Sequence, residues 1–203
     1  MKRLVLASGN PGKLRELRAL LAPLAVEVLA QSDLGIAEPD EPHATFLENA
    51  LAKARQASRA AGLPALADDS GLCVEALGGE PGVHSAVYAG AEGGREARDA
   101  RNNAKLLAQL AGRAERSAHY TCVVVLVRHA DDPEPLVTEG RWHGAIGEAP
   151  RGANGFGYDP LFLVEGRRET AAQLPAEEKN RISHRGRALA QLLARMKESG
   201  WPR

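Results

Sequence analysis

Leu63-Pro64-Ala65-Leu66-Ala67-Asp68-Asp69-Ser70-Gly71-Leu72 joins an apolar run directly to two adjacent carboxylates, a hydroxyl and a glycine. The pattern predicts a strand that crosses the core and ends at the acids. Neighbouring side chains on a strand point to opposite faces, so Asp68 and Asp69 should have different roles. One would hold a metal ion or activate water, and the other would brace the turn. The alternative is an acidic surface turn, because Asp, Ser and Gly are ordinary turn residues.

The composition is that of an ordinary globular protein, with 203 residues, 44% hydrophobic and 26% charged, enough for one α/β domain of two lobes. The formal net charge is zero, which argues against a protein held to a nucleic acid polymer or a membrane by bulk charge. No apolar run has the length of a membrane span, and the first residues do not resemble a signal peptide. Cys73 and Cys122 lie in apolar runs and predict reduced core residues. We therefore expect a cytoplasmic protein.

The N-terminal segment predicts a strand, a glycine loop and a helix. Residues 3–7 are apolar after Arg3 and read as a buried strand, residues 8–12 are turn formers, and leucines recur at helical spacing from Lys13 onward. Such a loop offers backbone N–H groups and a helix dipole to phosphate, and Lys13 adds a charge. The loop does not match a Walker A motif, and an ordinary tight turn between strand and helix is the alternative.

Acidic side chains gather in two further places. Residues 31–42 read as an acidic loop, and the following helix is expected to begin after Thr45, with Glu48 in a capping box, and to stop at Gly62. Magnesium takes carboxylate, water and phosphate oxygens, so Asp68 and Asp69 together with one acid of this region could hold it. The candidates for that acid are Asp40, Glu41 and Glu48, although capping is the simpler role for Glu48.

The rest of the chain predicts a mixed sheet with helices on both sides and a cleft, all within one domain, residues 1–203. Strands are expected at 120–127 and 136–142, joined as a hairpin, and at 161–164. Helices are expected at 96–110, at 175–179 and after Ser183. No linker separates independent domains.

Two segments of the C-terminal half suggest a ligand. Phe156 and Tyr158 lie in a glycine loop, where an exposed ring suits stacking on a base, and Asp159 could accept a hydrogen bond from a base edge. The alternative is a ring folded onto the core. Residues 179–185 gather cations before the last helix, a location that otherwise disfavours them, so an anionic ligand is expected there.

The order of these motifs closely resembles the inosine triphosphate pyrophosphatase family. It rests on Ser8 and Lys13 five positions apart, on Phe46-x-Glu48-Asn49-Ala50, on residues 67–72, on Gly155-Phe156-Gly157-Tyr158-Asp159-Pro160 and on Ser183-His184-Arg185. The resemblance implies an elongated mixed sheet, two lobes around a central cleft and a homodimer. It also implies Mg²⁺-dependent hydrolysis of ITP, dITP and XTP to the monophosphate and pyrophosphate. A pyrophosphatase for pyrimidine or modified nucleotides and a non-catalytic nucleotide-binding module are the alternatives.

The resemblance also implies roles for single residues. Asp69 would be the proton acceptor that activates water and a metal ligand. The second acid would come from the loop 38–41, where the spacing does not single out one of Glu38, Asp40 and Glu41. The substrate would contact Ser8, Gly9, Asn10, Pro11, Gly12, Lys13, Ser70, Phe156, Gly157, Tyr158, Asp159, Lys179, His184 and Arg185. Ser8 stands where Thr is common in the family, which keeps the hydroxyl. Val87 stands where the family usually has arginine, so a contact from that position is in doubt.

Overall fold

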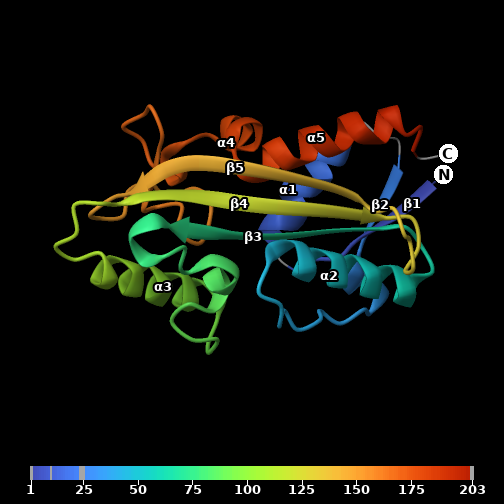
Figure 1. The fold of residues 1–203 in the computed structure, drawn as a ribbon, viewed down its shortest axis with the longest axis horizontal. Helices are drawn as coiled ribbons and strands as arrows, with labels where there is room; N and C mark the ends of the chain where they lie inside the picture. The colour runs from blue at the N-terminus through green and yellow to red at the C-terminus, as the bar shows by residue number, and fades with distance from the viewer. Residues whose placement is uncertain (1, 10, 23–25, 202–203) are drawn as a thin grey trace. The chain divides into compact units, whose positions relative to one another are not determined.

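The computed structural model describes residues 2–9, 11–22 and 26–201. Its six strands form one sheet in the order β2-β1-β3-β4-β5-β6 (Figure 1). β1 (Lys2–Leu6) pairs in parallel with β2 (Val26–Ala30) and with β3 (Ala65–Val74). β4 (Ser117–Val127) follows, and β5 (Leu136–Ile146) pairs antiparallel with β6 (Phe162–Val164). The sheet is therefore mixed, and the predicted α/β fold class is confirmed.

The chain divides into two compact units. Unit 1 comprises Met1–Asp69, Cys122–Gly140 and Arg185–Arg203, and unit 2 comprises Ser70–Thr121 and Arg141–His184. The strands β3, β4 and β5 each contribute residues to both units. The predicted cleft between two lobes stays a prediction.

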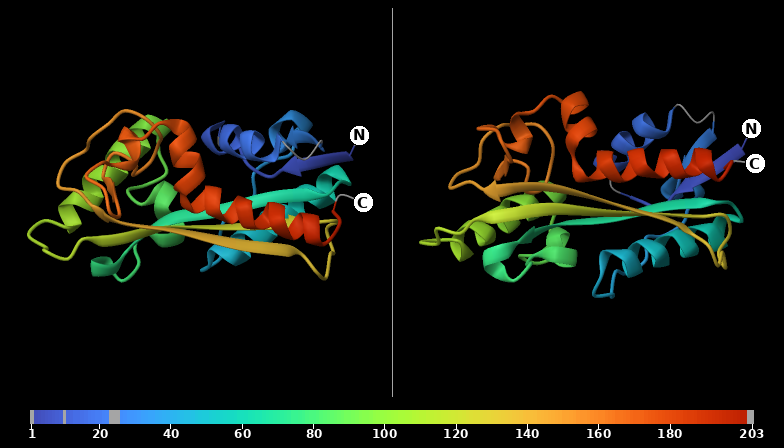
Figure 2. Two further views of the ribbon diagram at one scale, coloured as in Figure 1. Left: turned by 90° about the horizontal axis from the view of Figure 1, so that it is seen from above. Right: turned by 45° about the horizontal axis from the view of Figure 1, so that its top comes forward.

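In unit 1, helices cover both faces of the strands. α1 (Pro11–Leu21) and α5 (His184–Glu198) lie on one face and α2 (Phe46–Ala61) on the other (Figures 1 and 2). Side chains of β4 alternate between two cores. Cys122, Val124 and Leu126 pack with α1 and α5. The residues between them, Val123, Val125 and Val127, pack with the alanines of α2. Both faces of this strand are buried, which explains its unbroken apolar sequence.

Unit 2 has a core rich in aromatic rings. The ring centroids of Tyr120 and Trp142 lie 4.7 and 5.1 Å from that of Phe162. Leu106 and Leu110 join this core from α3 (Arg95–Gln109) and the residue that follows it. A second α-helix of this unit is α4 (Ala176–Ile182). Most of the few aromatic residues of the chain thus serve packing, which is their usual role.

β3 corrects the prediction that a strand ends at the two acids. The strand runs for ten residues, and Asp68 and Asp69 are its fourth and fifth residues. Leu72 and Val74 continue it into the core of unit 2, where both are fully buried. The alternative of an acidic surface turn is also wrong, because the two acids are buried, with exposed fractions of 2% and 4%. A strand interior tolerates buried acids only when cationic or polar groups compensate them.

The other predicted elements are found with shifted ends. α1 begins at Pro11, and the strands of the hairpin are longer than expected, at Ser117–Val127 and Leu136–Ile146. Thr45 caps α2 as predicted, since its hydroxyl accepts from the Glu48 N–H at 3.2 Å. The Glu48 carboxylate, however, accepts from that hydroxyl at 2.7 Å, where a full capping box would use the Thr45 N–H. Glu48 is therefore committed to the cap.

Two further expectations concern the whole chain. Cys73 and Cys122 are both free thiols; Cys122 is buried, as predicted for a core residue, whereas Cys73 is only half-buried. Among the helices within the described ranges, none is long and apolar enough to cross a membrane.

Candidate active site

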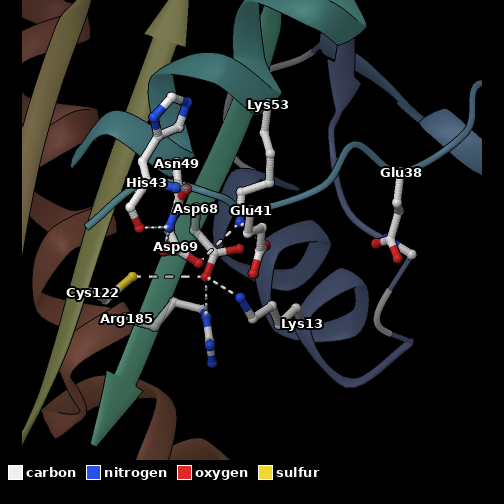
Figure 3. A network of polar contacts seen from close by, with 11 residues as sticks. Lys13, Glu38, Glu41, His43, Asn49, Lys53, Asp68, Asp69, Cys122 and Arg185 are labelled. Carbon is white, nitrogen blue, oxygen red and sulfur yellow. Dashed lines mark hydrogen bonds and ion pairs between the residues drawn. The ribbon is translucent and has the colours of Figure 1, made fainter. Parts of the chain in front are cut away.

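Asp68 and Asp69 point to opposite faces of β3, as the alternation of a strand predicts (Figure 3). Asp68 faces α1 and α5. Its Oδ2 atom lies 3.0 Å from Lys13 Nζ and 3.3 Å from Arg185 Nε. Burial alone would raise the pKa of Asp68, but the charges of Lys13 and Arg185 outweigh it and hold that pKa well below its usual range. Asp68 is therefore an ionic brace and a poor proton acceptor.

Asp69 faces α2, which supplies two polar partners. Lys53 Nζ lies 3.0 Å from Asp69 Oδ1, and Asn49 Nδ2 lies 3.3 Å from Oδ2 (Figure 3). Asn49 is held in turn by the backbone of His43, whose N–H donates to its Oδ1 at 3.1 Å. Burial raises the pKa of Asp69, and the charge of Lys53 opposes this only in part. A carboxylate with a raised pKa and fixed oxygens is suited to accept a proton from water.

Lys53 links Asp69 to a second acid. Its ammonium donates to Glu41 Oε1 at 2.7 Å as well as to Asp69, so the two carboxylates are neighbours. The side chain of Lys53 is 8% exposed and that of Glu41 is 41% exposed. Asp40 and Glu38, two other acids of the same loop, are exposed, and the Glu38 carboxylate accepts from the Gly9 N–H. The geometry thus brings Glu41 near Asp69 through their shared partner Lys53, and its role as a metal ligand stays a prediction.

The chemistry of these oxygens fits magnesium. The described part of the chain holds no group of three or more His, Cys, Asp or Glu side chains placed to bind a metal ion. Magnesium seldom needs such a group, because it usually takes one or two carboxylates and completes its shell with water and substrate phosphate. Asp69 and Glu41 would be those carboxylates.

The loop between β1 and α1 has the character of an anion site. The Gly9 N–H donates to the Glu38 carboxylate, and a Cβ atom at Gly9 would lie 2.7 Å from Glu38 Oε1. Lys13 lies in the first turn of α1 and Ser8 is buried beside the loop. Asn10, a predicted substrate contact, lies outside the described residues. A backbone N–H that already binds a carboxylate oxygen can bind a phosphate oxygen in the same way.

In unit 2, Asp159 is the centre of the glycine loop predicted to bind a base. It is buried, and its Oδ2 accepts from the Phe156 N–H at 2.9 Å and from Lys179 Nζ at 2.7 Å. Gly155 has φ +76°, and a Cβ atom there would lie 2.0 Å from Asp159 Oδ2. The loop therefore folds around its own carboxylate, and only glycine is compatible with that turn.

The two rings of this loop differ in their surroundings. Phe156 is half-buried, and its ring centroid lies 4.6 Å from the Arg95 guanidinium and 4.8 Å from Lys179 Nζ. Tyr158, in contrast, is 4% exposed and belongs to the core of unit 2, where its hydroxyl donates to Ser85 O at 2.9 Å. The expectation of an exposed ring is therefore wrong for Tyr158, because its ring follows the apolar core. The ring of Phe156 keeps the position suited to stacking.

The predicted cation cluster is used in three different ways. Lys179 bonds Asp159 in unit 2. His184 stacks on Tyr120, with ring centroids 4.6 Å apart and planes 9° apart. Arg185, one residue later but in unit 1, pairs with Asp68. Their roles as substrate contacts stay predictions, as does that of Ser70, which is half-buried in β3.

Sequence reasoning assigned no role to Lys53, Asn49, Asp99 or Asn103. A signal for the first two was present, because they are one helical turn apart on the buried, alanine-rich face of α2. Polar side chains on such a face are costly unless they meet a partner, and here that partner is Asp69. Asp99 and Asn103 are likewise one turn apart on α3, and both bind the backbone of Gly157. Val87 is 40% exposed, and no role is assigned to it.

Comparisons with known proteins match this chain over nearly its full length. A sequence model of the Ham1 family matches residues 4–195. The chain is 62% identical to a dITP/XTP pyrophosphatase of Ralstonia nicotianae over 197 residues, which cover 97% of this chain and 98% of that protein. It is 60% identical to the protein of the same name from Bordetella pertussis over 200 residues, covering 98% and 93% of the two chains. A HAM1 protein from Coxiella burnetii has a solved structure with a TM-score of 0.89 and 46% identity, covering 98% of this chain and all of that one. The resemblance inferred from the motifs is confirmed, and the chain belongs to the Ham1 family.

Proposed function

We propose that this protein is a nucleoside triphosphate pyrophosphohydrolase that converts ITP, dITP and XTP to the monophosphate and pyrophosphate. The observation that carries the proposal is a buried Asp69 whose pKa is raised, fixed by Lys53 and Asn49 and adjoined by Glu41. The relatives named dITP/XTP pyrophosphatase, at 60–62% identity, support the same substrate class. The removal of deaminated purine nucleotides from the nucleotide pool would be its role.

In unit 1, the phosphates would bind the loop that precedes α1. The Gly9 N–H, now bonded to Glu38, would donate to a phosphate oxygen, and Ser8 would add a hydroxyl donor. Lys13 would provide positive charge where the negative charge of the triphosphate accumulates. Charge neutralisation of this kind makes pyrophosphate a better leaving group.

Asp69 would act as the general base. Its carboxylate would accept a proton from a water molecule that attacks the α-phosphorus, and the bond from that phosphorus to the β-phosphate oxygen would break. Asn49 and Lys53 would hold the carboxylate in one orientation during this step. A positioned base contributes on the order of a hundredfold to ten-thousandfold in rate.

Magnesium is the proposed cofactor, held by Asp69 and Glu41. When bound, it would supply further positive charge to the phosphate oxygens. The ammonium of Lys53, which contacts both carboxylates, would add positive charge beside them.

In unit 2, Phe156 would stack on the base, and Lys179 would recognise the substituent at position 6 of the purine. Lys179 Nζ lies over the Phe156 ring and is held by Asp159. An ammonium can donate only, so it suits the 6-oxo group of hypoxanthine or xanthine, whereas the 6-amino group of adenine offers it no acceptor. A site that hydrogen-bonds one such group can reject the analogue that lacks it strongly. His184 and Arg185 are the further candidate contacts.

We also propose that the protein acts in the cytoplasm as a homodimer, as the family resemblance implies. The alternatives remain a pyrophosphatase for pyrimidine or modified nucleotides and a nucleotide-binding module without catalysis.

Substrate profiling with product identification tests the proposal. Pyrophosphate release would be measured with ITP, dITP, XTP, ATP, dUTP and 7-methyl-GTP, each with and without Mg²⁺. We expect equimolar pyrophosphate and monophosphate from the three deaminated purine nucleotides, a requirement for Mg²⁺, and little turnover of ATP. Preference for dUTP or 7-methyl-GTP, or binding of ITP without release of pyrophosphate, would favour the alternatives.

A further inference from the structure

One face of α3 is directed at the glycine loop that carries Phe156. Arg95, Asp99 and Asn103 are spaced four residues apart and therefore lie along one side of the helix. Asp99 Oδ2 accepts from the Gly157 N–H at 2.9 Å, and Asn103 Nδ2 donates to Gly157 O at 2.9 Å. The backbone N–H and the backbone C=O of Gly157 are thus both bound by side chains of α3.

This arrangement fixes the residue next to the stacking ring. Gly157 has φ +64°, the left-handed region that other residues rarely adopt, so its backbone conformation is special. Its two neighbours are Phe156 and Tyr158, and the Tyr158 ring is already fixed in the core. On the other side, the Phe156 N–H is bound by Asp159. The backbone is therefore fixed on both sides of the Phe156 ring. Asp159 binds the Phe156 N–H, and side chains of α3 bind Gly157.

Asp99 also acts on the ring through a cation. Arg95 Nε lies 3.9 Å from Asp99 Oδ2, and the Arg95 guanidinium lies 4.6 Å from the centroid of the Phe156 ring. The side chains of Arg95 and Asp99 are 34% and 27% exposed, so this contact lies at the edge of the loop. One carboxylate therefore positions both the loop backbone and the cation that lies over the ring.

We propose that Asp99 and Asn103 are positioning residues that set the affinity of the enzyme for the base of its substrate. They act by holding Gly157, and through it Phe156, in the orientation needed for stacking. This inference rests on the proposed function, because it assumes that Phe156 binds a base. It gives α3 a part in substrate binding. The sequence alone assigned no role to Asp99 or Asn103.

The test compares Asp99→Ala and Asn103→Ala with a matched control, Glu96→Ala. Glu96 is an exposed carboxylate in the first turn of the same helix. Dissociation constants for ITP and for inorganic tripolyphosphate would be measured by calorimetry, together with KM, kcat and Tm. Tripolyphosphate has no base, so it reports the phosphate contacts alone.

For Asp99→Ala we expect an ITP dissociation constant and a KM raised by roughly tenfold, the loss typical of one charge-assisted hydrogen bond. Asn103→Ala should give a smaller rise in the same direction. The kcat at saturating ITP and the affinity for tripolyphosphate should stay unchanged in both variants. Asp99→Asn, which keeps an acceptor for the Gly157 N–H, should recover most of the affinity, and Glu96→Ala should match the unmodified protein.

Unchanged ITP affinity in both alanine variants would overturn the inference. So would an equal loss of ITP and tripolyphosphate affinity, because that pattern indicates general damage to the fold. Failure of the proposed function is distinguishable, since it would appear in the unmodified protein as absence of pyrophosphate release from ITP. Because binding is measured directly, the inference about the base is decided whether or not turnover occurs.

Discussion

Two adjacent residues of the same type can have opposite electrostatic properties when a strand directs them to different neighbours. The pKa of Asp68 is lowered by Lys13 and Arg185 on one face, and that of Asp69 is raised by burial on the other. The strand pattern predicted the division of roles but not which acid had which role, and the choice of Asp69 as the base came only from the family resemblance. The assignment of the two roles depended on the position of Lys53, which comes from a helix whose register against β3 is set by tertiary packing.

Replacement of Lys53 by methionine should move the pH dependence of the reaction. The lysine charge lowers the pKa of Asp69, so its loss should raise that pKa further, and the acidic limb of the profile of kcat/KM should shift to higher pH. The variant should also be less stable by on the order of 3 kcal/mol, because Asp69 would stay buried without its ion-pair partner. Both effects would be read from pH–rate profiles and urea unfolding.

A matched control for this variant is Arg59→Met on the same helix. Arg59 pairs with Asp131, but both side chains are largely exposed, at 65% and 87%. Exposed ion pairs contribute little, so this variant should retain the normal profile and stability. A Lys53→Met profile that coincides with that of the control would remove Lys53 from the account of Asp69.

Phe156→Ala is expected to raise KM for ITP with a much smaller effect on kcat, because stacking binds the base and does not touch the reacting phosphorus. Base stacking on an aromatic ring is worth about 1–3 kcal/mol, which corresponds to a rise of roughly fivefold to a hundredfold. Steady-state kinetics with ITP measure both constants. An unchanged KM would show that the ring does not contact the base.

At the scale of elements, local patterns predicted which segments form strands and helices, but their ends depended on packing. The acids of β3 are poor strand residues by type, so the sequence pattern placed the end of the strand at them. The strand continues because Leu72 and Val74 find a core in unit 2 and because the two acids find cations in unit 1. In the same way, Tyr158 was expected to be exposed from its glycine neighbours, and the core of unit 2 buried it.

The turn between β4 and β5 provides a test at this scale. Asp132 is fully buried there and accepts from the N–H groups of Arg128 and Glu134 at 2.9 and 3.0 Å and from Arg128 Nε at 2.9 Å. The hydrogen bonds from Arg128 hold the pKa of Asp132 well below its usual range. A carboxyl with a lowered pKa stabilises the folded state above its unfolded pKa, and this contribution is lost as the pH falls toward the folded value.

Asp132→Asn should therefore lower Tm by a few degrees near pH 7, because one amide oxygen cannot replace two carboxylate oxygens. The difference in Tm from the unmodified protein should stay constant down to about pH 4, the ordinary pKa of an unfolded aspartate, and shrink below it, since the unmodified protein then loses the same contribution. Calorimetric scans of both proteins on either side of this pH measure it. A difference that stays constant below it as well would show that ionisation of Asp132 does not stabilise the turn.

At the scale of the whole molecule, the chain crosses from one unit to the other within three strands. β3, β4 and β5 each contribute residues to both units. Unfolding of these strands in one unit would therefore disturb the same strands in the other unit. The prediction of a single domain, residues 1–203, stays a prediction that this continuity favours. No linker-like segment could be seen in the sequence, but how the residues divide into units depends on contacts that a linear pattern does not contain.

Thermal unfolding should accordingly be one cooperative transition. The calorimetric enthalpy should equal the van't Hoff enthalpy, and probes of Trp142 fluorescence and of far-ultraviolet circular dichroism should give the same midpoint. Two resolved transitions would instead indicate units that unfold independently.

The most direct test of the account is the turnover of ITP by the Asp69→Asn variant at saturating substrate and Mg²⁺. We predict a fall in kcat of at least about a hundredfold, with circular dichroism and the affinity for ITP close to those of the unmodified protein, because an amide keeps the shape but is not a base. Release of pyrophosphate at the normal rate by this variant would contradict the assignment of Asp69 as the group that activates water.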